Sequence, residues 1–167
     1  NAPVIDRLIA AGAVIVGRTN MTEFAFSGLG LNPHYGTPKN PWDRAGGGRI
    51  PGGSSSGAAV SVTDGMAVVG IGSDTGGSVR IPSALCGLTG FKPTQRRVPI
   101  DGTVPLSTSL DSIGPLAASV RCCAIVDAVL AGEPPVVPAA RDVRDARLAV
   151  PETLVLDGMD NAVAAAF

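Results

Sequence analysis

The spacing of apolar and polar residues predicts alternating helices and strands near the start of the chain. Residues 2–11 carry apolar side chains at helical spacing, which predicts an amphipathic helix that ends at Gly12. The apolar run at residues 13–17 predicts a buried strand. Residues 22–28 predict a short helix capped by Thr22.

A second group of apolar segments follows a long loop that is rich in Gly, Pro and Asn. Residues 54–65 begin with serines, which favour helix N-termini, and continue with small apolar residues, so they predict a buried helix. The run at 66–74 predicts a strand covered on both faces. Residues 78–87 predict a short helix that ends at Gly87, and residues 88–93 predict the next strand.

The remaining residues predict one amphipathic helix, a connector and one more strand. The helix is expected at 118–131, followed by a proline-rich surface segment at 131–143. Residues 146–151 predict a strand, with a further helix after it. Alternating strands and helices are typical of an α/β domain, so we expect a mixed, mostly parallel sheet flanked by helices. Because both ends of the chain fall within helical patterns, we expect a piece of a larger domain.

Composition excludes several classes of function. Hydrophobic residues make up 45% and charged residues 16% of the chain, with a net charge of −1, so neither nucleic acid nor an anionic membrane is an expected partner. The apolar runs are too short to span a bilayer. Three cysteines, two of them adjacent at 122 and 123, favour a reducing compartment and a cytoplasmic location. We expect no metal and no other cofactor, and leave a homo-oligomer open.

Two segments concentrate glycine and serine, at 51–57 and 72–80. Glycine runs allow several N–H groups to converge, and a following helix N-terminus adds partial positive charge, so such turns bind oxyanions or phosphates. A phosphate loop of the Walker type needs a lysine after the glycines, and neither Lys39 nor Lys92 has that place. Most such clusters are plain turns whose serines cap helices, and this interpretation stays open from composition alone.

Two serines are candidate nucleophiles. Ser55 fits the G-x-S-x-G pattern formally, but a glycine-rich loop precedes it instead of a strand, and His34, the single histidine, lies upstream of it. Ser78 follows two glycines after a predicted strand and begins a helix, so its hydroxyl and the N–H groups of residues 75–78 can surround one carbonyl group. This geometry favours Ser78 for acyl transfer. Ser73 is expected to pack against a neighbouring segment.

Several motifs in one collinear order resemble the amidase signature family. They are PGGSSSGAAVSV, GIGSDTGGSVRIPSALCGLTGFKPT and SLDSIGPLAASV, with GRTNMTEFAFSG and GTPKNPWD upstream. The resemblance covers residues 1–132, which we expect to be a partial core of that fold. Residues 133–167 are then expected to be a connector and the start of the C-terminal part of the same domain.

The resemblance implies an amide hydrolase that uses a Ser, cis-Ser, Lys triad. Ser78 matches the nucleophile, and Ser54 matches the bridging serine that follows a cis peptide bond. Thr75, Gly76, Gly77 and Ser78 would supply the oxyanion-hole N–H groups. The family's lysine matches no residue of this chain, so residues 1–167 alone are expected to be inactive. A neutral buried lysine can act as the base, since a serine hydroxyl needs activation before it attacks an amide.

The resemblance also bears on neighbouring residues and on the exact activity. Lys92 matches a lysine that we interpret as structural, and Asp74 and Arg80 are expected to brace the nucleophile turn. Phe26 is a candidate for lining a small-molecule amide pocket together with Ser54, although a core role for this aromatic residue is favoured. Residues 95–111 depart from the glutaminase subunit of an aminoacyl-tRNA amidotransferase, so a stand-alone amidase is preferred. That glutaminase and a catalytically silent binding module stay as alternatives.

Overall fold

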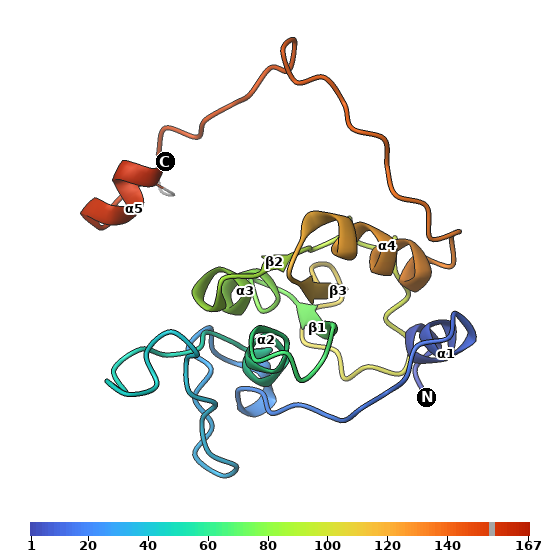
Figure 1. Ribbon diagram of the computed structural model, residues 1–167, viewed down its shortest axis with the longest axis horizontal. Helices are drawn as coiled ribbons and strands as arrows, with labels where there is room; N and C mark the ends of the chain where they lie inside the picture. The colour runs from blue at the N-terminus through green and yellow to red at the C-terminus, as the bar shows by residue number, and fades with distance from the viewer. Residues whose placement is uncertain (154–155) are drawn as a thin grey trace.

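The computed structural model describes residues 1–153 and 156–167 and places a small sheet between helices (Figure 1). The three strands are β1 (Val69–Asp74), β2 (Thr89–Gly90) and β3 (Ser112–Ala117), and β3 lies between the other two. The α/β class predicted from the sequence is confirmed. The mostly parallel sheet is wrong for these strands, because both pairs are antiparallel. Burial on both faces indicated parallel pairing, but here helices cover an antiparallel sheet.

The helices coincide with most of those predicted. They are α1 (Pro3–Ala10), α2 (Ser56–Thr63), α3 (Arg80–Cys86), α4 (Val120–Ala131) and α5 (Asn161–Ala166), with a 3-10 helix η1 (Glu23–Ala25). Gly87 ends α3 in the left-handed conformation, as expected. Thr22 precedes η1, but its side chain makes no capping hydrogen bond, so that expectation is wrong. Residues 154 and 155, within the helix expected after the last strand, lie outside the described residues.

The central strand β3 separates two clusters of buried side chains. Neighbouring side chains of a strand point to opposite faces, so Ile113 and Leu116, three residues apart, face different clusters. Leu116 packs with residues of α2 and α3, and Ile113 packs with residues of α1 and α4. The helices therefore cover both faces of the sheet (Figure 1). Sequence analysis missed β3, because Gly114 and Pro115 lie inside it and proline is rare in a central strand.

Two predicted strands do not form. Residues 13–17 and 146–151 have neither strand nor helix structure, and they are exposed: Val14 is 83% and Leu148 90% accessible to solvent. A strand requires a neighbour to pair its backbone N–H and C=O groups, and neither segment lies in the sheet formed by β1, β2 and β3. An apolar run alone is therefore insufficient.

The three cysteines are free. Among the described residues, no helix has both the length and the apolar character needed to cross a membrane.

Candidate active site

The two glycine–serine segments lie next to each other. The N–H of Ser55 donates to the carbonyl oxygen of Ser78 at 3.1 Å. Gly72 of β1 allows this approach, because a Cβ atom at that position would lie 2.9 Å from the Cβ of Ser55. The peptide bond between Gly53 and Ser54 is cis, as the resemblance implies. The fold thus brings the predicted nucleophile and the segment of the predicted bridging serine together.

Ser54 is fully buried, and its backbone is fixed. Its carbonyl oxygen accepts from the N–H of Thr22 at 3.0 Å and of Ser56 at 2.8 Å. Its Oγ has no hydrogen-bond partner among the described residues, and the same holds for the hydroxyls of Ser56 and Thr22. A buried hydroxyl that lacks a partner costs free energy, so the site has polar capacity that the described residues leave unused.

The predicted nucleophile turn, residues 75–78, joins β1 to α3. Within the part of the chain that the structure describes, none of its four N–H groups donates to a backbone or side-chain acceptor. The next two N–H groups, of Val79 and Arg80, donate to Asp74 Oδ2 at 3.0 and 3.3 Å. Gly77 has φ +143°, a conformation that side-chain-bearing residues rarely adopt, so the turn depends on glycine. The arrangement provides successive free donors beside Ser78, which suits an oxyanion.

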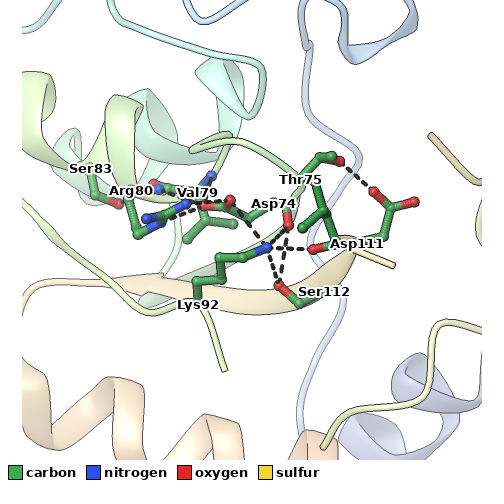
Figure 2. Close-up of polar contacts among 9 residues, drawn as sticks. Asp74, Thr75, Val79, Arg80, Ser83, Lys92, Asp111 and Ser112 are labelled. Carbon is green, nitrogen blue, oxygen red and sulfur yellow. Dashed lines mark hydrogen bonds and ion pairs between the residues drawn. The ribbon is translucent and has the colours of Figure 1, made fainter. Parts of the chain in front are cut away.

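The expected brace between Asp74 and Arg80 is confirmed. Asp74 is fully buried, and its carboxylate accepts from Arg80 Nε at 3.1 Å and Nη2 at 3.0 Å (Figure 2). Burial by itself would raise the pKa of Asp74, but hydrogen bonds from the Arg80 side chain and from the Val79 and Arg80 N–H groups lower it overall. The carboxylate therefore stays ionised and holds the start of α3 against the end of β1.

Lys92 and Asp111 complete the support of the turn (Figure 2). Lys92 Nζ donates to the Asp74 carbonyl oxygen, to the Leu110 carbonyl oxygen at 2.7 Å and to Ser112 Oγ at 3.0 Å. These three acceptors use all the donors of an ammonium group, which agrees with a structural lysine and leaves no lone pair for a base. Sequence analysis missed Asp111, and its signal was the SLDSIGP segment, whose Asp lies directly before β3.

The hydrolase-elbow alternative gains no support from the geometry. Ser55 is the residue before α2, and an irregular segment precedes it, as the sequence indicates. His34 Nε2 lies 3.0 Å from Glu23 Oε1, and both side chains are largely exposed. The imidazole therefore pairs with a glutamate on the surface. Among the described residues, no three His, Cys, Asp or Glu side chains gather as metal ligands.

Two other expectations for single residues are wrong. Phe26 is 78% exposed, so it is no core aromatic. Ser73 is an exposed residue of β1 and borders a cavity of about 240 Å³, so it does not pack against a neighbouring segment as expected. That Phe26 lines a substrate pocket stays a prediction.

Comparison with known proteins agrees with this geometry. The family model described as Amidase matches residues 1–167. The chain belongs to the amidase signature family. Among curated members of this amidase family, 2-amino-5-chloromuconic acid deaminase of Comamonas testosteroni is 45% identical over 166 residues, which is 98% of this chain and 36% of that protein.

A second amidase-family relative is a glutamyl-tRNA(Gln) amidotransferase subunit from Roseiflexus castenholzii, 44% identical over 179 residues, which is 99% of this chain and 36% of that protein. A crystal structure of an amidase superimposes with a TM-score of 0.76 at 44% identity, over 80% of this chain and 30% of that one. The chain thus spans 36% of the length of these curated amidase relatives.

Proposed function

We propose that the protein hydrolyses the carbon–nitrogen bond of a linear amide, with Ser78 as nucleophile and Ser54 as proton relay. The observation that carries the proposal is the turn at residues 75–78, whose four N–H groups lack acceptors among the described residues. Family membership supports the reaction class, because relatives include an amidase and amidotransferase subunits. Three free cysteines support our further proposal of a cytoplasmic location.

The proposed reaction begins with attack of Ser78 Oγ on the amide carbonyl carbon. As the O–C bond forms, the hydroxyl proton passes to Ser54 Oγ, which in turn gives its own proton to the base. A hydroxyl can do both, since it donates and accepts, and Ser54 Oγ is buried with no other partner among the described residues. The N–H groups of Thr75, Gly76, Gly77 and Ser78 stabilise the negative charge on the carbonyl oxygen.

Collapse of the tetrahedral intermediate breaks the C–N bond, and the relay returns the proton to the leaving nitrogen. An acyl ester on Ser78 remains. Water then attacks this ester and gives up a proton through the same relay, which releases the carboxylic acid and restores the serine. The base is proposed to be a lysine outside residues 1–167, because Lys92 uses all three N–H donors and Lys39 lies exposed in a loop. We accordingly expect residues 1–167 alone to be inactive.

The glutaminase component of an amidotransferase is the second candidate, supported by the relative from Roseiflexus castenholzii. The two candidates share the chemistry at Ser78 and differ in substrate. Hydrolysis rates of glutamine and of a simple aliphatic amide by the whole protein separate them. A stand-alone amidase cleaves the simple amide without a partner protein.

The proposal is tested by amide hydrolysis with serine variants of the whole protein. Ser78→Ala is expected to lower kcat by about 10⁴-fold or more, since it removes the nucleophile. Ser54→Ala is expected to lower kcat by about 10²–10⁴-fold, the contribution typical of a proton-transfer group. Ser73→Ala is the matched control, because Ser73 is exposed on the neighbouring strand, and its activity should equal that of the wild type. Full activity of Ser78→Ala would overturn the proposal.

A further inference from the structure

Lys92 holds a backbone carbonyl at the end of β1 that adjoins the nucleophile turn. The acceptor is the carbonyl oxygen of Asp74, to which Ser112 Oγ also donates, at 3.2 Å (Figure 2). The Lys92 ammonium is itself fixed by Leu110 and Ser112, and it lies 3.5 Å from Asp74 Oδ1. The Asp74 carbonyl therefore receives two hydrogen bonds from side chains whose own positions are restrained.

The direction of this carbonyl determines the direction of the next N–H. The C=O of Asp74 and the N–H of Thr75 belong to one planar trans peptide unit, in which the two groups point in opposite directions. Fixing the carbonyl toward Lys92 therefore points the Thr75 N–H away from Lys92. This N–H has no acceptor among the described residues. A cation at the carbonyl also polarises the peptide unit, which makes its N–H a stronger donor.

The side chain of Thr75 is restrained as well. Its hydroxyl donates to Asp111 Oδ1 (Figure 2), and Asp111 Oδ2 accepts from the N–H groups of Leu106 at 2.8 Å and Ser107 at 2.9 Å. Asp111 is 8% exposed, so these bonds are shielded from water. Thr75 is thus held through its side chain by Asp111 and through its preceding peptide by Lys92.

We propose that Lys92 is a positioning residue of the reaction, which aims the Thr75 N–H at the oxyanion by holding the Asp74 carbonyl. The inference rests on the proposed function, because only a reaction at Ser78 places an oxyanion at this turn. Lys92 does not contact the substrate in this account. Its contribution arises in the transition state, where the negative charge on the carbonyl oxygen is largest.

The test compares Lys92→Met with Lys39→Met in the whole protein. Methionine keeps most of the length of the lysine side chain and removes its donors, and Lys39 is the other lysine of the chain, exposed in a loop. We expect Lys92→Met to lower kcat for amide hydrolysis by about tenfold or more, with KM within about threefold of the wild type. Lys39→Met should leave both constants unchanged.

A second readout distinguishes positioning from general support of the fold. A trifluoromethyl ketone with the acyl group of the substrate adds to the serine and carries the oxyanion, so it reports on the turn directly. Its inhibition constant should rise in Lys92→Met by the same factor by which kcat/KM falls. An unchanged inhibition constant, or a loss of kcat that only follows the folded fraction, would overturn the inference.

Ser112→Ala keeps the inference testable if Lys92→Met does not fold. It removes one of the two donors to the Asp74 carbonyl, so the same readouts should shift in the same direction by about two- to fivefold. Wild-type values for Ser112→Ala in a folded protein would contradict the inference. If Ser78→Ala abolishes hydrolysis while the Lys92 and Ser112 variants behave as wild type, the inference alone fails. If Ser78→Ala stays active, the proposed function fails with it.

Discussion

Two ion pairs of the same residue types show how differently two regions of the molecule are built. Asp74 and Arg80 lie at the junction of β1 and α3, where the carboxylate is buried and also accepts from the Val79 N–H. Asp142 and Arg144 lie in the connector, with side chains 58% and 87% exposed. Hydrogen bonds from arginine lower the pKa of Asp142, and they contribute to the lowered pKa of Asp74 despite its burial. Only the buried pair joins elements of the fold.

Apolar segments show the same contrast. Residues 69–74 and 146–151 both predict strands, yet only the first pairs with a neighbour and lies between α2 and β3. The second is exposed throughout. In both comparisons the local sequence is similar and the surroundings differ. Stability in this chain is therefore expected to depend on residues near the sheet and to be insensitive to the connector.

The largest expected effect on stability comes from the central strand. Leu116→Ala should lower the free energy of unfolding by about 2–5 kcal/mol, because Leu116 is fully buried and its truncation leaves a cavity. Leu148→Ala is the matched control in the connector and should leave stability unchanged, since Leu148 is 90% exposed. Urea unfolding of the whole protein measures both. Equal losses from the two substitutions would contradict the contrast.

The two ion pairs give the next largest difference. Asp74→Ala should cost about 2–3 kcal/mol, because the Val79 N–H and the half-exposed Arg80 side chain lose their acceptor. Asp142→Ala is expected to leave the unfolding midpoint unchanged, since surface pairs contribute little. Thermal unfolding of the two variants checks this. A large loss from Asp142→Ala would show that the connector is structured by its charges.

Acid titration gives a smaller effect with a defined sign. The pKa of Asp74 is lower in the folded protein than its ordinary value of about 3.9, so its ionised form contributes stability above about pH 4. That contribution is lost as pH falls through the lower folded pKa. Stability of the wild type should therefore fall more steeply below pH 4 than that of Asp74→Asn, which cannot titrate. Parallel curves in urea unfolding between about pH 2 and pH 5 would contradict this assignment.

Local sequence predicted the helices and β1 well, because their signals are local. Serines before small apolar residues mark α2, and Gly87 marks the end of α3. The pairing direction of the sheet and the strand β3 were not predictable in this way, since Pro115 argues against a central strand and only tertiary contacts override it. The boundary between residues 132 and 133 stays a prediction.

The candidate site was predicted where its motifs are contiguous. Ser78 and its glycines follow one another in the sequence, and Asp74 lies within two turns of Arg80, so their relation could be stated from spacing. Lys92 and Asp111 reach the same turn from separate loops, 18 and 37 residues away from Asp74. Their roles depend on the antiparallel return of β3, which the sequence pattern did not indicate.

The most direct test of the central claim is to locate the adduct of a fluorophosphonate on the whole protein. Trypsin is expected to release residues 50–80 as one peptide, because Arg49 and Arg80 bound it and no lysine or arginine lies between them. Fragmentation by mass spectrometry then distinguishes the serines within this peptide. The account predicts the adduct on Ser78 and none in Ser78→Ala. An adduct on Ser55 or Ser73, or no adduct on a folded wild-type protein, would contradict it.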